Sequence, residues 1–234
     1  MTESKKTNPN IGPHTAPLFE PLNSPLGILG GTFDPVHFGH LRLAEEAHEA
    51  LDLDGVLWVP AGKPAHRNPP RATAAHRLEM LRLAIAGNAR FAVDTLEIDS
   101  NKPSYTVPTL ERLRVLYGPR PLVLILGSDA FMGLPTWHRW EELFALAHIA
   151  VATRPGTELN VEQMPPALAA EFQPRLSSLP ADLRAAPAGC IVPFSMTPLS
   201  ISASLIRARQ AVGLSPRYLI PDPVREYIDR EHLY

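Results

Sequence analysis

Short apolar runs alternate with segments of helical periodicity along most of the chain. The apolar runs predict strands at residues 26–31, 56–59, 91–98, 122–126 and 149–153, with a further possible strand at 190–194. Apolar residues at helical spacing predict helices at 37–51, 73–86, 107–116, 141–146, 202–211 and 224–232. Strands that alternate with helices require a parallel sheet covered on both faces. The predicted fold class is therefore α/β, a doubly wound Rossmann-like sheet.

Two proline-rich segments lie outside this alternation. Residues 1–24 are polar and carry Pro9, Pro13 and Pro17, which predicts a disordered leader that packs little. Residues 155–188 show weak periodicity and are interpreted as a variable connection rather than a second domain. We therefore expect a single domain over residues 25–234.

Composition narrows the class of protein without naming a function. The chain has 234 residues, 45% hydrophobic and 20% charged, as in an ordinary globular domain. No apolar stretch is long enough to cross a bilayer, and no signal-peptide core precedes residue 24. The single Cys190 excludes an internal disulfide and fits a reducing compartment, so we expect a cytoplasmic protein. A net charge of −2 favours neither nucleic acid nor a membrane as partner.

The segment after the first strand carries the strongest local signal. Two glycines allow a tight turn and a close approach of the backbone to a ligand. The following helix directs its N-terminus toward the carboxyl end of the sheet, where open α/β sheets bind ligands and free N–H groups favour phosphate. The candidate residues of this segment are Gly30, Gly31, Thr32, Phe33, His37, Gly39 and His40. The two histidines could instead cap the helix or bind a metal, although no third ligand stands nearby in sequence.

A second anion-binding pattern opens the helix at 202–211. Ser202 and Ser204 place hydroxyl groups among the free N–H groups of a helix start. Arg207 lies one turn later and can reach the same anion with its planar guanidinium. The alternative is an ordinary serine cap followed by a surface arginine.

These two segments resemble the signatures of the nucleotidyltransferase superfamily. Residues 30–40 are similar to its extended histidine–x–glycine–histidine motif, and residues 201–207 are similar to Ile-Ser-x-Thr-x-Ile-Arg, with serine in place of threonine at 204. The superfamily includes nicotinate-mononucleotide, pantetheine-phosphate and glycerol-phosphate members. The resemblance implies that His37 and His40 bind the α- and β-phosphate region of ATP. It also implies that Ser202, Ser204 and Arg207 hold the triphosphate.

Further residues resemble those of bacterial nicotinate-mononucleotide adenylyltransferases in particular. Trp137 is expected to stack on the pyridine ring, Thr106 to bind the nicotinate carboxylate, and Asp129 to accept from ribose hydroxyls. Arg154 is expected near the acceptor phosphate, and either Lys63 or Arg67 contacts phosphate. The elements that carry this resemblance are Lys63, Arg67, Ser104, Tyr105, Thr106, Gly127, Asp129, Trp137 and Arg154. Core packing and helix capping remain the alternative roles for Trp137, Thr106 and Asp129.

The resemblance implies transfer of AMP from ATP to nicotinate mononucleotide by direct displacement, with release of pyrophosphate. Mg²⁺ is expected as cofactor, bound mainly through the ATP phosphates. Nicotinamide mononucleotide and pantetheine phosphate are alternative acceptors, and an ATP-sensing module without turnover is an alternative of a different class. A dehydrogenase is disfavoured because Gly-x-Gly-x-x-Gly is absent. A homo-oligomer is possible, and the sequence does not fix the oligomeric state.

Overall fold

One parallel sheet organises the chain. The computed structural model describes residues 11–12, 18–19, 24–65, 69–156 and 159–234. Seven strands pair in the order β1-β4-β3-β2-β5-β6-β7, and every pair is parallel. Their bounds are β1 Ile11–Gly12, β2 Leu26–Gly31, β3 Gly55–Pro60, β4 Phe91–Asp94, β5 Leu122–Gly127, β6 His148–Thr153 and β7 Ile191–Ser195. The predicted doubly wound α/β class is confirmed.

The strand order reverses between β2 and β5. From β2 the chain continues outward through β3 to β4, and it then returns to β5 beside β2 before continuing through β6 to β7. Leu26 of β2 is in register with both Gly55 of β3 and Leu122 of β5. A reversal of this kind leaves a crevice at the carboxyl ends of the two central strands, where open α/β sheets bind their ligands.

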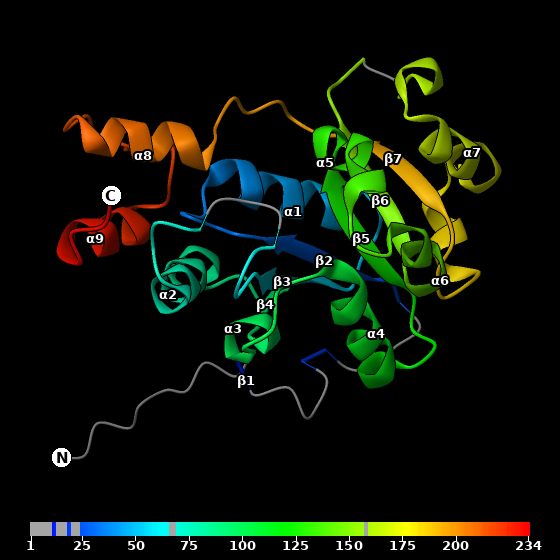
Figure 1. Ribbon diagram of the computed structural model, residues 1–234, viewed down its shortest axis with the longest axis horizontal. Helices are drawn as coiled ribbons and strands as arrows, with labels where there is room; N and C mark the ends of the chain where they lie inside the picture. Colours follow the sequence, from blue (N-terminus) through cyan, green and yellow to red (C-terminus); the bar gives the residue numbers. More distant parts are fainter. Residues whose placement is uncertain (1–10, 13–17, 20–23, 66–68, 157–158) are drawn as a thin grey trace.

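Helices cover both faces of the sheet because the strand side chains alternate between two cores. Leu29 and Trp58 point into one core, whereas Ile28 and Leu57 point into the other. The first core is closed by α1, α2, α8 and α9, which lie together at one end of the molecule, and the second by α4 to α7 (Figure 1). The helices are α1 Phe38–Ala50, α2 Ala74–Ile85, α3 Leu96–Asp99, α4 Thr106–Tyr117, α5 Ser128–Met132, α6 Leu143–Leu146, α7 Pro166–Arg175, α8 Ala203–Ala211 and α9 Asp222–Arg230.

Local sequence signals explain where several helices begin. Thr73 caps α2, since its side chain accepts a hydrogen bond from the backbone N–H of His76. Ser202 caps α8 in the same way, with Leu205 as the donor. Short 3₁₀ helices fill the connections at Leu134–Thr136, Trp140–Glu142, Val161–Gln163 and Pro180–Arg184. Within the part of the chain that the structure describes, no helix is long and apolar enough to cross a membrane.

One predicted strand is too long, and one predicted connection contains a helix that its weak periodicity does not indicate. The strand predicted over 91–98 ends at Asp94, whose carboxylate accepts from the N–H of Leu96 and starts the short helix α3. The connection over 155–188 contains the helix α7, with Leu168 and Phe172 buried one turn apart. Pro165 and Pro166 lie at its N-cap and first helical position, where a missing N–H costs no helical hydrogen bond, and Pro174 lies in its last turn.

The leader also differs from its prediction where the structure describes it. Ile11–Gly12 forms β1 on the edge of β4. Phe19 packs against the second core and fills the space beside Gly55, where an added Cβ would lie 2.4 Å from its ring. The backbone N–H of Leu18 donates to the hydroxyl of Tyr117. The prediction of a leader that packs little is therefore wrong at these residues, while 1–10, 13–17 and 20–23 lie outside the described residues.

Candidate active site

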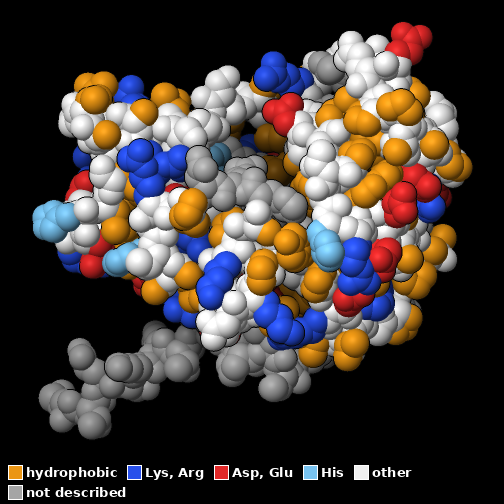
Figure 2. All heavy atoms as spheres, viewed as in Figure 1, with side chains coloured by type: hydrophobic (Ala, Val, Ile, Leu, Met, Phe, Trp, Pro, Cys, Tyr) orange, Lys and Arg blue, Asp and Glu red, His pale blue; other side chains and the backbone are white. Residues whose placement is uncertain are grey.

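Open backbone lies at the carboxyl ends of both central strands. A Cβ added to Gly30, at the end of β2, or to Gly127, at the end of β5, would meet no atom within 4 Å. Gly31 differs, because its added Cβ would lie 2.7 Å from the ring of Phe33. Gly31 is thus required by packing of the turn, whereas Gly30 and Gly127 leave room for a ligand against the backbone. In the space-filling view the surface is hollowed between α8 and α5 (Figure 2).

The two predicted histidines stack at the start of α1. Their ring centroids are 3.7 Å apart, and Phe33 packs its ring edge-to-face on His40. Nδ1 of His40 accepts a hydrogen bond from the backbone N–H of His37, at 3.3 Å. In the neutral ring this leaves Nε2 as the protonated nitrogen, which donates hydrogen bonds. His40 can therefore cap the helix through Nδ1 and, at the same time, donate a hydrogen bond to a ligand through Nε2.

His37 is held as a neutral ring. Its side chain is only 6% exposed, and this burial lowers its pKa from 6.5 to about 4. Its Nδ1 is buried, and the backbone N–H of His40 faces the ring in a capping-box contact that falls short of a well-formed hydrogen bond. A buried polar atom without a good partner costs free energy. A Cβ added to Gly39 would lie 3.0 Å from that same nitrogen, so glycine is needed at 39 for the ring to sit there.

This burial predicts a pH-dependent loss of stability. Between pH 6.5 and pH 4 the unfolded chain binds a proton at His37 and the folded chain does not. The free energy of unfolding should therefore fall as the pH drops through this window, by up to about 3 kcal/mol from this group. His37→Gln should flatten that part of the profile, measured by urea unfolding at pH 7, 5.5 and 4. Equal slopes in the two proteins would contradict the buried neutral state, since all other groups titrate in both.

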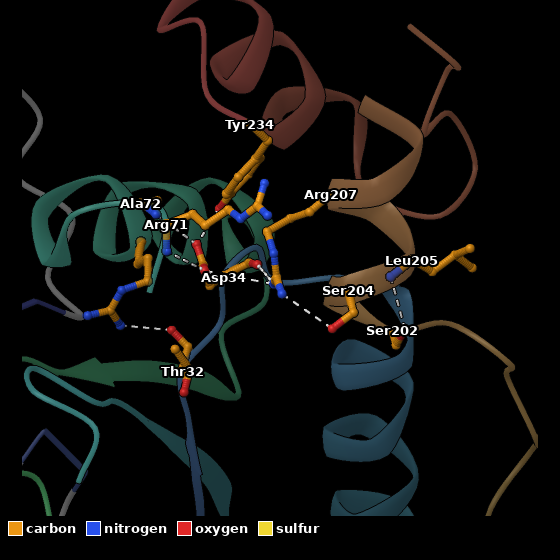
Figure 3. A network of polar contacts seen from close by, with 10 residues as sticks. Thr32, Asp34, Arg71, Ala72, Ser202, Ser204, Leu205, Arg207 and Tyr234 are labelled. Atoms are coloured by element: carbon orange, nitrogen blue, oxygen red, sulfur yellow. Dashed lines mark hydrogen bonds and ion pairs between the residues drawn. The ribbon is translucent and has the colours of Figure 1, made fainter. Parts of the chain in front are cut away.

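Asp34 is the centre of a polar network that joins four segments (Figure 3). Its carboxylate is 5% exposed and accepts from the backbone N–H groups of Arg71 and Ala72, at 2.9 and 3.1 Å. The hydroxyl of Tyr234 donates to the same carboxylate at 2.7 Å. Nη1 of Arg207 donates to the backbone carbonyl of Asp34 at 2.6 Å and lies 3.8 Å from its Oδ2. The turn after β2 is thereby attached to the segment before α2, to α8 and to the chain after α9.

The second predicted anion site meets the first through this network. Nη2 of Arg207 donates to Oγ of Ser204 at 3.3 Å, which sets the guanidinium over the start of α8. The start of α8 also approaches α1, because a Cβ on Gly39 would lie 3.6 Å from the carbonyl oxygen of Ile201. The structure thus brings together two segments that lie about 160 residues apart in sequence. Both helices begin at the same end of the sheet, and N-termini so placed favour a shared anionic ligand.

On the other side of β2, the predicted Lys63 and Ser104 are joined to each other. Oγ of Ser104 accepts from the N–H groups of Gly62 and Lys63, and the N–H of Ser104 donates to the carbonyl of Lys63. Nζ of Lys63 donates to the carbonyl of Asn101. Ser104 therefore fastens the loop after β3 to the start of α4, a positioning role that sequence reasoning did not foresee. The alternative Arg67 lies outside the described residues.

The remaining predicted residues lie at the start of α4 and after the strands β5 and β6. The ring of Tyr105, at the N-cap of α4, packs against His138 with centroids 4.5 Å apart, and Trp137 directly precedes His138. Thr106 opens the helix. Asp129 is exposed in the first turn of α5, beyond β5. Arg154 is exposed after β6, two residues past Ala152, which is in register with Gly127.

Sequence reasoning missed a buried arginine that links two loops of the site. Arg77 is 1% exposed, and its guanidinium donates to the carbonyls of Thr32 and Gly62, at 2.8 and 3.1 Å. It thereby ties the turn after β2 to the loop after β3. Its signal was present in the sequence: Arg77 stands four residues before Leu81, on the side of α2 that faces the core.

The histidine pair has no third side chain beside it that would complete a metal site, within the described residues. Among the residues that the structure describes, no group of three or more His, Cys, Asp or Glu side chains is placed to hold an ion. The two rings are also stacked face to face.

Comparison with known proteins agrees with this geometry. The cytidylyltransferase-like family model matches residues 28–209. A probable nicotinate-nucleotide adenylyltransferase of Dechloromonas aromatica is 56% identical, over 91% of this chain and 99% of its own length. A relative of the same description in Halorhodospira halophila is 47% identical, over 89% and 94% of the two chains.

Solved structures agree on the fold. The nicotinic acid mononucleotide adenylyltransferase of Plasmodium falciparum, complexed with NaAD, has a TM-score of 0.68 at 16% identity and covers 90% of this chain and 97% of its own. At this low identity, the likeness shows that the two proteins share a fold and nothing more. The family match and the two relatives confirm the resemblance seen in the sequence. The chain belongs to the cytidylyltransferase-like family and, within it, to the nicotinate-nucleotide adenylyltransferases.

Proposed function

We propose that the chain transfers AMP from ATP to nicotinate mononucleotide, forming nicotinate adenine dinucleotide and pyrophosphate. The observation that carries the proposal is the 2.6 Å hydrogen bond from Arg207 to the carbonyl of Asp34, which joins the two phosphate-binding segments at the carboxyl end of β2. The description of the relatives as probable nicotinate-nucleotide adenylyltransferases supports the choice of acceptor. So does the fold neighbour from Plasmodium falciparum, a nicotinic acid mononucleotide adenylyltransferase complexed with NaAD.

The reaction is an in-line displacement. An oxygen of the acceptor's 5′-phosphate attacks the α-phosphorus of ATP, and the bond from that phosphorus to the bridging oxygen breaks. Pyrophosphate leaves with the electron pair of that bond. Negative charge grows on the transferring group and on the leaving group, so catalysis rests on placed donors and cations rather than on a nucleophilic side chain. Nε2 of His40 is the donor, and the guanidinium of Arg207 is the cation.

The ATP site is formed around β2 and the start of α8. Gly30, at the end of β2, leaves its backbone open to the nucleotide, while Gly31 and Phe33 shape the turn. Ser202 caps α8, and Ser204 holds Arg207. Thr32 uses its carbonyl to accept from Arg77. The buried ring of His37 sets the position of His40 by stacking.

Mg²⁺ is proposed as the cofactor, bound mainly through the phosphates. The carboxylate nearest to the glycine turn, Asp34, does not fit the role of ligand, since three hydrogen-bond donors already occupy its two oxygens. Mg²⁺ keeps several waters and is satisfied by phosphate oxygens and few protein ligands. Bound in this way, it would neutralise charge on the β- and γ-phosphates. The cytoplasmic location and a homo-oligomer stay predictions.

The function is tested by measuring pyrophosphate release. Purified protein is supplied with Mg-ATP and, in separate reactions, nicotinate mononucleotide, nicotinamide mononucleotide or pantetheine phosphate. The largest kcat/KM should be found with nicotinate mononucleotide. Release with pantetheine phosphate alone would contradict the acceptor and spare the chemistry. ATP binding without release in any reaction would favour the ATP-sensing alternative.

The loop with Trp137 predicts an effect specific to the acceptor. Trp137→Ala should raise KM for nicotinate mononucleotide by about 10- to 100-fold through loss of stacking on the pyridine, and change KM for ATP much less. The measurement is steady-state kinetics with each substrate varied in turn. Trp140→Ala is the matched control, because Trp140 packs against the second core as Trp137 does and also contacts Phe144, so it tests the effect of lost packing alone. Equal rises in both KM values would indicate that Trp137 only supports the fold.

A further inference from the structure

Tyr234 reaches the phosphate-binding turn from the far end of the sequence. After α9 the backbone of His232 takes a left-handed conformation, with φ of 52°, and the N–H of Leu233 donates back to the carbonyl of Ile228. This turn reverses the chain and packs Tyr234 against the first core. Its hydroxyl donates to Oδ1 of Asp34 at 2.7 Å, across 200 positions of sequence (Figure 3).

The Tyr234 hydroxyl is important to the Asp34 carboxylate because few other donors reach it. Oδ1 otherwise accepts only the longer bond from Ala72, at 3.1 Å, while Oδ2 accepts from Arg71. A buried carboxylate that loses a donor seeks another partner, because its desolvation is costly. Among the described residues, the cation paired with Asp34 is the guanidinium of Arg207, which lies 3.8 Å from Oδ2 and donates to the carbonyl of Asp34 rather than to its carboxylate.

We propose that Tyr234 is a positioning residue for adenylyl transfer: by satisfying Asp34, its hydroxyl keeps the guanidinium of Arg207 directed at the phosphates of ATP. Without the hydroxyl, Arg207 would shift toward the Asp34 carboxylate and pair with it. Its charge would then be neutralised inside the protein instead of by the substrate. The inference rests on the proposed function where it concerns the rate of adenylyl transfer. The hydrogen bond between Tyr234 and Asp34 also predicts an effect on ATP binding, which is measured without turnover.

The burial of Tyr234 supports a role as donor. Burial, reinforced by the hydrogen bond to Asp34, raises the pKa of its hydroxyl. The hydroxyl therefore stays protonated across the range in which the enzyme is assayed. Arg77, whose charge also acts on Asp34, has both of its Nη groups committed to the carbonyls of Thr32 and Gly62.

The test is a double-mutant cycle between Tyr234→Phe and Arg207→Ala. Phenylalanine keeps the packed ring and removes only the hydroxyl. In the otherwise unchanged protein, Tyr234→Phe should lower kcat/KM for ATP by about fivefold, and in the Arg207→Ala background by less than about 1.5-fold. The same four proteins are titrated with ATP by calorimetry, and the loss of affinity on Tyr234→Phe should likewise vanish without Arg207.

Tyr227→Phe is the matched control. It also removes a short hydrogen bond from α9, the 2.8 Å contact between the Tyr227 hydroxyl and Nδ1 of His76, without touching Asp34. It should lower the melting temperature at least as much as Tyr234→Phe does and leave kcat/KM for ATP within twofold.

Three results would overturn the inference: no change in Tyr234→Phe, equal losses with and without Arg207, or a loss in Tyr227→Phe as large as in Tyr234→Phe. Failure of the proposed function is recognised separately. It would show as absence of pyrophosphate release from the unmodified protein, and in that case the calorimetric cycle still decides whether Tyr234 acts through Arg207.

Discussion

Replacement of His40 by alanine should lower kcat by about 100- to 1,000-fold at saturating ATP and acceptor, because it removes a placed donor from the region where charge develops. His40 is suited to this role by its own contacts. Its Nδ1 accepts from the N–H of His37, so the neutral ring carries its proton on Nε2. Phe33 and His37 pack on the ring from two directions and fix its orientation. A donor already held in place costs no reorganisation during the reaction.

The measurement is pyrophosphate release with both substrates varied, so that kcat is separated from KM. His40→Ala also removes an acceptor from the start of α1, which costs about 1 kcal/mol of stability, so each assay is run well below the melting temperature. His48→Ala, in the last turn of the same helix, is the matched control and should retain nearly full kcat. If His40→Ala lost less than about tenfold in kcat, the central role of His40 would be wrong.

The fold was predictable from sequence where local pattern and tertiary packing agree. The aliphatic run of β5 and the apolar residues before the glycines of β2 indicate buried parallel strands, because side chains on both faces of such strands pack into a core. The apolar pattern did not predict secondary structure where its periodicity is weak or where one polar residue ends one element and begins the next. The weak apolar periodicity around α7 does not predict this helix, although Leu168 and Phe172 are buried on one side of it. Asp94 ended a strand and began α3 through one side-chain hydrogen bond that no apolar pattern records.

The site was predictable to the extent that its chemistry is local. Glycines at a turn, histidines at a helix start and a serine cap each act on backbone groups within a few positions, so a short window of sequence reveals them. Asp34, Arg77 and Tyr234 act on partners that the fold supplies from elsewhere. The bond from Tyr234 to Asp34 spans 200 positions, and no window of a single sequence contains both residues. Arg77 was the exception, since an arginine on an apolar helix face already signals a buried partner.

Arg207→Ala should lower kcat/KM for ATP by about 100-fold or more, because in the proposed site Arg207 is the cation held between the two predicted phosphate-binding segments. Nη1 and Nη2 bond the carbonyl of Asp34 and the hydroxyl of Ser204, which hold the guanidinium plane, and the side chain remains 23% exposed. Arg207→Lys keeps the charge and loses the two-pronged attachment, so it should recover only part of the activity. The measurement is steady-state kinetics with ATP varied, together with the affinity for pyrophosphate.

Arg209→Ala is the control within the same helix, since Arg209 donates to the carbonyl of Ser215 and takes no part in the Asp34 network. It should leave kcat/KM for ATP within twofold. If Arg207→Lys matched the unmodified protein, charge alone would suffice and the fork geometry set by Asp34 and Ser204 would be irrelevant. If Arg207→Ala and Arg209→Ala lost activity equally, α8 would contribute only as a structural support, and the phosphates would have to be bound by α1 and the glycine turn alone.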